Sequence, residues 1–447
     1  MGLRNKHPTF IYRNYEYNFK NGNLNISFDF EIKPNITFRP SLKIKNVPEN
    51  NFNEDILNNL IFNLGMIELV SYYKATCSPK IVIACAKLNA KQKNFWKKIY
   101  FKGLGEFFYQ NKIDFTSKDF LKIECISKKE FGVKKIKTSE KILLPIGGGK
   151  DSIVSLNLLK DENLCLFGLN ETKEIKRTIG NREHIYIERK IDKKLLELNN
   201  KGYYNGHTPF SAYLAFLTLL TAYLINAKYI ALSNEGSSNE ETAVYLNKKI
   251  NHQYSKTFEF ENDFRNYVKE YMIEGIEYFS FLRPLHEIQI AKIFSKFKDY
   301  HKIFLSCNEA NKTYSGTKKK TQKWCGSCPK CLFVFAILYP FMEEKELFKI
   351  FNKNLFEDKN LKEEMLKLIG KAKTKPFECI GTKDESLIAF YLSYKKDKDY
   401  YLLNYLEKNN YFKNLDKKTE KILNSFNIKN NVPKKFKNIL EHETRSA

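Results

Sequence analysis

The sequence lacks the features that mark secreted, membrane-spanning and repetitive proteins. Its first ten residues contain no apolar stretch like that of a secretory signal. No internal repeat or low-complexity tract is present, which excludes a solenoid and a disordered linker. The uncharged run 210–227 reaches the lower edge of a membrane span, but serine, threonine and asparagine interrupt it and no second run follows. We therefore predict a cytoplasmic protein without a membrane span.

The two commonest nucleotide-binding motifs are also missing. In a P-loop, four residues separate the first glycine from Gly-Lys-Ser/Thr, and here Lys150 is followed by Asp151. The dinucleotide fingerprint G-x-G-x-x-G occurs nowhere in the chain. These absences exclude a P-loop nucleotide hydrolase and a Rossmann-type dinucleotide site.

Acidic residues are scarce relative to basic ones. The chain has 76 Lys and Arg against 51 Asp and Glu, a formal charge of +25. Such an excess can indicate nucleic-acid binding. The lysines are spread along the chain instead of being gathered in one arm, and an acidic small substrate fits the charge as well. We therefore do not expect a nucleic-acid partner, and the sequence does not indicate an oligomeric state.

The spacing of apolar residues divides the 447 residues into three regions. Residues 1–135 are predicted to form an α+β domain, because strictly alternating apolar residues are followed by amphipathic helices. Its expected elements are strands at 10–19, 24–32 and 80–86, a turn at 21–23, and helices at 54–76 and 91–112.

Apolar runs and helical segments alternate in the second region, 136–342, which is typical of a parallel sheet with helices on both faces. The predicted fold class is therefore α/β. Ligands of such sheets bind at the carboxyl ends of the strands. Residues 343–447 are predicted to form a helical cap without a recognisable site. The strands of the second region are expected at 141–146, 164–169, 183–188, 229–233 and 303–306, and its helices at 151–160, 209–227, 240–249 and 287–298.

Three glycines stand between the first of these strands and its helix. Gly147, Gly148 and Gly149 follow the apolar run, and Lys150, Asp151 and Ser152 open the helix. Glycines let backbone N–H groups approach an anion, and a helix N-terminus adds unpaired donors and partial positive charge. The arrangement predicts a phosphate site, although a plain turn between strand and helix has the same pattern.

This stretch resembles the SGGxDS loop of the ATP-pyrophosphatase, or PP-loop, family, if Lys150 is the variable position. Gly147 stands where that family has serine, so one hydroxyl is missing. The resemblance implies an adenine-nucleotide α-hydrolase core of the HUP type. It also implies that Gly147–Gly149 and Ser152 bind the pyrophosphate of ATP, that Lys150 neutralises its charge, and that Asp151 binds Mg²⁺ or orients the triphosphate. Asp151 also fits a plain acid at a helix N-terminus.

Three of the nine cysteines form a C-x₂-C-x₂-C motif, Cys325, Cys328 and Cys331. Two such steps in tandem suit tetrahedral coordination of Zn²⁺ by thiolates, and Cys307 is the best candidate for the fourth ligand. An iron–sulfur cluster is the alternative. The absence of a secretory signal favours a metal site over disulfides.

Two enzyme families resemble larger parts of the chain. The glycine loop followed by the cysteine motif resembles cyano-deazaguanine synthase over 141–341. Seven blocks resemble the UDP-N-acetylmuramoyl-L-alanyl-L-glutamate epimerase family over nearly the whole length. These are SYYKATCSPKIVI, YFKGLGEFFY, PIGGGKDSIVSL, GHTPFSA, SNEGSSNE, FLRPLHEIQIAKIF and WCGSCPKCLFVF.

The first resemblance implies a structural zinc at Cys307, Cys325, Cys328 and Cys331. The second implies an ATP- and Mg²⁺-dependent epimerase of peptidoglycan precursor synthesis. Its substrate would be UDP-MurNAc-L-Ala-L-Glu, whose terminal L-Glu is inverted to D-Glu through an acyl adenylate. The alternative is a deazaguanine-synthase-like or other nucleobase-modifying enzyme on the same core.

Residues near the predicted sheet edge are candidates for proton transfer and substrate binding. His207 can act near neutral pH or simply bond a turn. Cys77, with Lys74 nearby to stabilise a thiolate, is a second catalytic candidate or an inert cysteine after a helix. The candidates for contacts to metal, ribose, carboxylate or phosphate are Glu235, Asn239, Glu240, Arg283 and His286, which equally fit solvated loop acids and a helix start.

Overall fold

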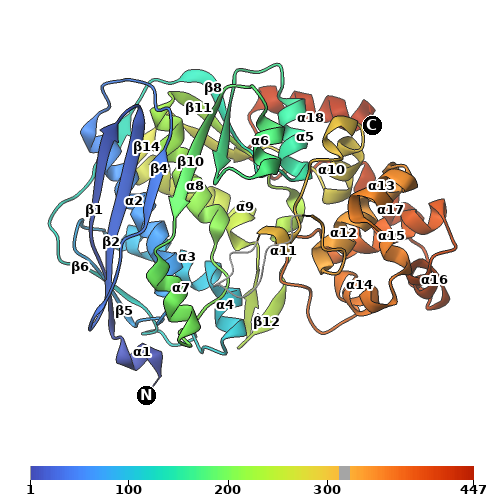
Figure 1. The fold of residues 1–447 in the computed structure, drawn as a ribbon, viewed down its shortest axis with the longest axis horizontal. Coiled ribbons are helices and arrows are strands. Elements are labelled where there is room, and N and C mark those ends of the chain that lie inside the picture. The colour runs from blue at the N-terminus through green and yellow to red at the C-terminus, as the bar shows by residue number, and fades with distance from the viewer. Residues whose placement is uncertain (1, 312–322, 447) are drawn as a thin grey trace.

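The computed structural model describes residues 2–311 and 323–446. The fold is α/β and is organised around one large mixed sheet with the order β15-β11-β8-β9-β10-β4-β2-β1-β5-β6, with β3 (Ile36–Phe38) paired to β2 (Figure 1). The strands of the main path are β15 (Glu277–Ser280), β11 (Ala227–Leu232), β8 (Ser139–Pro145), β9 (Leu164–Leu169), β10 (His184–Lys190), β4 (Ser41–Ile44), β2 (Asn23–Ile32), β1 (Thr9–Lys20), β5 (Lys80–Ile83) and β6 (Lys122–Cys125).

The five strands β15, β11, β8, β9 and β10 are parallel to one another. Their chain order is β8, β9, β10, β11, β15, so the chain first builds outward from β8 on one side and then returns to build on the other. The point where the order reverses lies between β8 and β11. In open parallel sheets, ligands bind in the crevice at the carboxyl ends of the strands at this point.

The amino-terminal strands continue the same sheet. β4 pairs antiparallel with β10, β2 lies between β4 and β1, and β5 and β6 follow in parallel. The two regions therefore share one unbroken set of backbone hydrogen bonds. The domain boundaries expected near 135 and 342 stay a prediction.

Helices cover both faces of the sheet, and strand β8 accordingly has apolar side chains on both of its faces. Leu143 packs into one core with α2 (Glu54–Tyr73) and α8 (Phe210–Leu224), whereas Ile142 and Leu144 pack into a second core with helices of the other face. The helices of this second face include α5 (Lys150–Leu158), α10 (Glu287–Phe294) and α12 (Pro329–Leu338).

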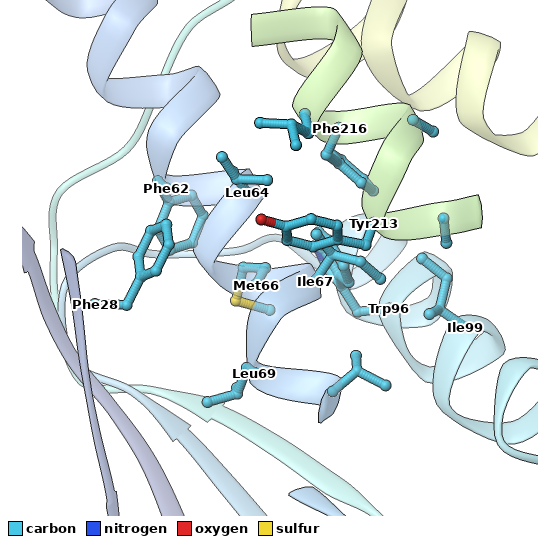
Figure 2. Packing of buried hydrophobic residues seen from close by; sticks show 14 of the residues in the cluster. Phe28, Phe62, Leu64, Met66, Ile67, Leu69, Trp96, Ile99, Tyr213 and Phe216 are labelled. Carbon is cyan, nitrogen blue, oxygen red and sulfur yellow. The ribbon is translucent and has the colours of Figure 1, made fainter. Parts of the chain in front are cut away.

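Helix α2 is buried nearly all around, and its few buried polar side chains, such as Asn59 and Glu68, have partners inside the protein. Its Phe62, Leu64 and Met66 lie between Phe28 of the sheet and Tyr213 of α8 (Figure 2). Trp96 of α3 (Ala90–Gly103) stacks on Phe216 of α8 with ring centroids 5.2 Å apart. This packing supports the segments that carry Lys74 and His207.

Helix α8 contains the uncharged run that approaches the length of a membrane span. Most of its residues are buried in the first core, against α2 and β11. Within 2–311 and 323–446, no helix is long and apolar enough to cross a bilayer.

Two of the expected elements are wrong. Residues 303–306 are irregular, and the fifth parallel strand is β15 instead. Residues 240–249 form the hairpin of β12 (Ala243–Tyr245) and β13 (Lys248–Ile250), not a helix. Leu246 and Asn247 both take positive φ values, 49° and 59°, as a two-residue hairpin turn requires. The turn geometry therefore overrides the helix-like spacing of apolar residues.

The carboxy-terminal region is helical, as expected, and gathers at one end of the molecule in Figure 1. Its last helix, α18 (Lys434–Ser446), returns to the parallel strands, where Phe436 stacks on Phe279 and meets Tyr229 edge to face. The remaining helices are α1 (Leu3–Lys6), α4 (Gly105–Gln110), α6 (Lys173–Ile179), α7 (Lys193–Asn200), α9 (Phe258–Tyr271), α11 (Asn308–Asn311), α13 (Glu344–Phe351), α14 (Lys362–Leu368), α15 (Lys383–Lys396), α16 (Tyr401–Lys408) and α17 (Asp416–Leu423). Two further short strands, β7 (Lys134–Lys135) and β14 (Ile273–Glu274), pair with each other.

Candidate functional site

The glycine turn lies at the carboxyl end of β8, as the sequence predicts. Gly148 has a φ of +76°, and a Cβ there would lie 2.7 Å from Cβ of Glu174. Glycine is therefore required on both backbone and steric grounds. Gly149 is the N-cap of α5, so the backbone N–H groups at the start of that helix, which have no partner within it, lie directly after the turn. The Ser152 hydroxyl donates to the Gly149 carbonyl at 3.0 Å.

Three neighbouring parallel strands each deliver one carboxylate to a single point. Asp151 follows β8, Glu235 follows β11 and Glu287 follows β15 at the start of α10. One oxygen from each lies within 4.8 Å of the other two. The Lys150 ammonium forms ion pairs with both Asp151 and Glu287. We call Asp151, Glu235 and Glu287 the acidic cluster.

Two members of the acidic cluster, Glu235 and Glu287, are buried, Asp151 is partly exposed, and the charges of the cluster shift one another's pKa. Lys150 and Glu287 have side chains only 2% exposed. Burial alone would lower the pKa of Lys150, but Asp151 and Glu287 outweigh it and raise that pKa. Burial raises the pKa of Glu287 to about 7, with Asp151 and Glu235 adding to the effect and Lys150 opposing it. A hard divalent cation prefers such carboxylate oxygens, so the cluster fits Mg²⁺ chemically.

Two more lysines lie beside this cluster. Lys256 is close enough to Asp151, Glu235 and Glu287 for their charges to raise its pKa, although burial opposes the effect. Lys330 stabilises the anionic forms of Asp151 and Glu287. Lys256 and Lys330, together with Lys150, therefore place positive charges beside the carboxylates of the acidic cluster.

Arg283, predicted to bind substrate, is fully buried and faces the protein interior. Its guanidinium donates to the Glu235 carbonyl at 2.6 Å and to the Ser238 hydroxyl at 2.8 Å, and it pairs with Glu261 at 3.3 Å. It also donates to the Lys256 carbonyl and to the Ser280 hydroxyl. Since both of its terminal Nη groups donate within the fold, Arg283 acts on the site by fixing Glu235 and Lys256.

We expect Arg283→Met to lower the free energy of unfolding by about 3–5 kcal/mol, because it leaves buried Glu261 without its cation. Urea unfolding of the purified protein measures this. The control is the exposed Arg177, whose change to alanine should cost less than about 0.5 kcal/mol. If Arg283→Met lowered the free energy of unfolding by less than about 1 kcal/mol, the role of Arg283 in fixing the buried segment would be contradicted.

Two of the other predicted substrate residues, His286 and Glu240, contact the carboxy-terminal region. His286 lies 3.3 Å from Glu385 of α15, which outweighs burial and raises the pKa of the histidine. Glu240 pairs with Lys375 at 2.6 Å. Asn239 is exposed and bonds its own turn and the start of α9. The helical cap therefore reaches the site, which the sequence did not indicate.

The four predicted zinc ligands converge. The sulfur atoms of Cys307, Cys325, Cys328 and Cys331 all lie within 4.8 Å of one another, and none is in a disulfide. Sγ of Cys331 is 3.6 Å from that of Cys325 and 3.7 Å from that of Cys307. A tetrahedral zinc with bonds of about 2.3 Å places its sulfurs about 3.8 Å apart. The geometry fits Zn²⁺.

The cysteine site is joined directly to the glycine turn. The Leu305 N–H, two residues before Cys307, donates to the Gly148 carbonyl at 2.9 Å. A Cβ on Gly149 would meet Cβ of Ser306 at 3.4 Å. The segment that ends at Cys307 therefore supports the outer side of the turn.

A second group of polar side chains contains His207. Its Nδ1 lies 3.4 Å from Oε2 of Glu106, and its ring centroid is 4.5 Å from that of His252. Burial, His252 and Lys74 hold the pKa of His207 well below its ordinary value, so the ring is neutral. Burial also lowers the pKa of Lys74 to about 8. Lys74 can therefore exchange a proton near neutral pH, whereas His207 stays neutral there.

Cys77 lies in a different environment. Its thiol is buried and donates to the Tyr73 hydroxyl at 3.5 Å. Burial raises its pKa to about 11, which outweighs the effects of Tyr73 and Arg4. Cys77 is therefore held as a thiol, and the predicted catalytic role receives no support from this geometry.

A cavity of about 1580 Å³ opens beside these groups. It extends from Gly147 of the glycine turn to Lys74, Gly206 and Thr208, on either side of His207. A drug-sized ligand occupies about 300–1,000 Å³, so the volume admits a large substrate or two smaller ones. Its lining contains seven lysine and arginine residues and two glutamates, which favours an anionic ligand.

Two family models match this chain. The model of the MurL N-terminal domain matches residues 1–281, and that of the MurL C-terminal domain matches residues 303–419. The chain belongs to the MurL family. The chain is similar to proteins of this family, and two of them are named UDP-N-acetyl-alpha-D-muramoyl-L-alanyl-L-glutamate epimerase. The protein of Xanthomonas oryzae pv. oryzae (strain MAFF 311018) is 33% identical over 330 residues, covering 73% of this chain and 72% of the relative.

The relative from Micromonospora sp. (strain ATCC 39149) is 33% identical over 341 residues, 75% of this chain and 74% of the relative. No solved structure matches the chain. The resemblance seen in the sequence blocks is thus confirmed at the level of the MurL family.

Several residues of this MurL-family site were missed by sequence reasoning. Glu106, His252, Lys256, Glu287 and Lys330 belong to it, as does Cys379, described below. Glu106 and Glu287 lie in blocks that resemble the family, YFKGLGEFFY and FLRPLHEIQIAKIF, which was the available signal.

Proposed function

We propose that this protein inverts the terminal L-Glu of UDP-MurNAc-L-Ala-L-Glu to D-Glu, with ATP as the activating substrate. The observation that carries the proposal is the convergence of Asp151, Glu235 and Glu287 beside the glycine turn. The similarity to named epimerases supports the same substrate. The cationic cavity suits a molecule that carries a diphosphate and carboxylates.

Activation of the carboxylate explains why a nucleotide site belongs in an epimerase. The α-proton beside a carboxylate is too weakly acidic for an ordinary side-chain base. Transfer of AMP to that carboxylate gives an acyl adenylate, which accepts negative charge far better. After the proton has been removed from one face and returned on the other, water releases AMP and the inverted glutamate.

Each group around the turn has a place in this scheme. The N–H groups of the turn and of the start of α5 would bind the pyrophosphate that leaves. Lys150, with Lys256 and Lys330 nearby, would offset phosphate charge. Asp151, Glu235 and Glu287 would hold Mg²⁺, which supplies Lewis-acid polarisation of phosphate oxygens. Lys74 is the proposed acid near the reacting carbon, and the catalytic role expected of the neighbouring His207 stays a prediction.

The two further assignments are an ATP-pyrophosphatase core and a structural zinc. The reversal of strand order between β8 and β11, with the glycine turn at that point, supports the first. The spacing of the four sulfurs supports the second. A closed four-cysteine site leaves no open position on the metal, so its role is to hold the fold.

The test is incubation of the protein with Mg-ATP and UDP-MurNAc-L-Ala-L-Glu, followed by acid hydrolysis and separation of glutamate enantiomers. We expect D-Glu to accumulate together with AMP and pyrophosphate. Omission of ATP is the matched control and should leave only L-Glu. Persistent L-Glu without AMP would refute the proposal, and ATP consumption without inversion would refute the epimerase assignment.

A further inference from the structure

We propose that the thiolate of Cys379 exchanges the α-proton of the activated glutamate, held in place by His252 and Glu106. The inference rests on the proposed epimerisation and extends it to the group that moves the proton. None of the three residues was expected from the sequence. They come from the loop before α15, the loop after β13, and α4.

The three side chains form a continuous line. Sγ of Cys379 lies 3.8 Å from Nε2 of His252, and Nδ1 of the same ring contacts Oε2 of Glu106. A carboxylate that fixes an imidazole, which in turn faces a thiol, is the arrangement by which proteins activate a cysteine. Glu106 and His252 are nearly buried, with side chains 8% and 10% exposed. These two side chains are therefore shielded from bulk water, whereas Cys379 is partly exposed.

Two lysines connect this line to the acidic cluster, which suits a group that acts on the carbon next to the activated carboxylate. Lys256 interacts electrostatically with Cys379 and with all three carboxylates of that cluster. Lys330 interacts with Cys379 as well as with Asp151 and Glu287, and its ammonium donates to the Cys379 carbonyl. The α-carbon is bonded to the carboxyl group that receives AMP, so a proton-transfer group must lie close to the site of phosphate chemistry. Cys379 meets this requirement, whereas Cys77 has no contact with it in the described residues.

The charges that face Cys379 favour the thiolate. Burial alone would raise its pKa, but Lys256, the bonded His252 and Lys330 lower it to about 6. The pKa of His252 rises to about 10, because Cys379 and Glu106 outweigh burial. A thiolate–imidazolium pair results at neutral pH. Lys74, whose pKa is about 8, is protonated under the same conditions. Groups with pKa values displaced in opposite senses suit the opposite roles of base and acid.

The proton transfer uses Cys379 as the base and Lys74 as the acid. The α C–H bond breaks, an S–H bond forms on Cys379, and the electron pair of the C–H bond moves onto the activated carboxyl group as an enolate. The enolate then takes a proton from the Lys74 ammonium on the opposite face. After hydrolysis releases AMP, Cys379 gives its proton to solvent and Lys74 regains one. No oxidant or reductant is needed.

The first test needs neither ATP nor activity. The protein is treated with iodoacetamide across a range of pH, and the rate of alkylation of Cys379 is followed by peptide mass spectrometry. The expected midpoint is near pH 6. In His252→Gln the midpoint should move toward about 8.5, the value of an ordinary thiol. A midpoint near that value in the unaltered protein would overturn the proposal.

The second test separates proton transfer from carboxylate activation. Cys379→Ser should lower D-Glu formation, and solvent deuterium entry at the α-carbon, by about 10²–10⁴-fold. Dipeptide-dependent exchange of labelled pyrophosphate into ATP should persist, because activation precedes proton removal. Cys125→Ser, at a partly exposed cysteine on the edge strand β6, is the control and should behave as the unaltered protein.

Each alternative outcome is decisive. Full inversion by Cys379→Ser would overturn the role of the thiol. A substrate-derived thioester on Cys379 would assign it as a nucleophile instead of a base. A metal ion lost specifically from His252→Gln would assign Glu106, His207 and His252 to metal binding and overturn the role given to them here. If the unaltered protein neither exchanges pyrophosphate nor inverts glutamate, the epimerase proposal itself fails, which Cys379→Ser alone could not produce.

Discussion

Asp151→Asn should abolish ATP-dependent turnover while leaving the fold and the zinc content of the protein unchanged. The substitution keeps the shape of the side chain and removes one negative charge from the acidic cluster. Lys150, which pairs with both Asp151 and Glu287, is then left with Glu287 alone. The remaining carboxylates would bind Mg²⁺ more weakly and would misplace the cation that offsets phosphate charge. We expect AMP release to fall by about 10²–10³-fold or more.

The measurement is the rate of AMP and pyrophosphate formation under saturating Mg-ATP and dipeptide substrate, with zinc content and circular dichroism recorded on the same sample. Asp161→Asn is the matched control, because Asp161 is exposed after α5 and lies outside the cluster. The control should retain full activity. Turnover by Asp151→Asn close to that of the control would remove Asp151 from the site.

Two parts of the candidate site have the local arrangement that the sequence predicts, although their roles stay predictions. The strand–glycine–helix unit around Gly148 is set by neighbouring residues, and its turn requires glycine for a backbone reason. The cysteine motif is similarly local, and Cys307 could be paired with it because zinc needs a fourth ligand. Both features depend on short spacings that a single sequence shows directly.

The residues that were missed depend on long-range contacts. Glu287 becomes part of the acidic cluster only because β15 lies beside β11, and the four residues of β15 carry no long apolar run. Cys379 meets His252 across 127 residues of chain, and His252 meets Glu106 across 146. Strand order and loop packing bring these groups together, and neither is encoded in the spacing of any one segment.

Arg283 shows the converse limit. Its position before α10 and its charge suggested a contact with substrate, but its guanidinium is used by Glu261 and by backbone of the 235–256 segment. A sequence shows which side chains can bind an anion and does not show which ones the fold has already paired. Burial decides the question, because a fully buried arginine must be paired within the protein.

Cys331→Ser should remove zinc and lower both stability and nucleotide turnover. Cys331 contributes the sulfur that lies 3.6 Å from Cys325 and 3.7 Å from Cys307. Serine binds zinc poorly at neutral pH, because its hydroxyl does not ionise as a thiol does. The segment ending at Cys307 supports the glycine turn through the bond from the Leu305 N–H to the Gly148 carbonyl. Loss of the metal would therefore loosen the turn as well as the helices packed around α12.

The readouts are metal content by elemental analysis, thermal unfolding, and the Mg-ATP concentration that gives half-maximal turnover. We expect one zinc per chain in the unaltered protein, none in Cys331→Ser, and a colourless sample, since an iron–sulfur cluster would absorb visible light. Cys325→His should retain zinc, because a Cys₃His set also binds it. Cys125→Ser should match the unaltered protein in all three measurements.

If Cys331→Ser lost zinc but kept its unfolding temperature and its half-maximal Mg-ATP concentration, the metal would have no structural link to the glycine turn. Cys331→Ser is instead expected to unfold at a lower temperature and to need more Mg-ATP for half-maximal turnover, while Cys325→His keeps both values. That result would show that the zinc site and the phosphate site are structurally coupled through residues 305–307.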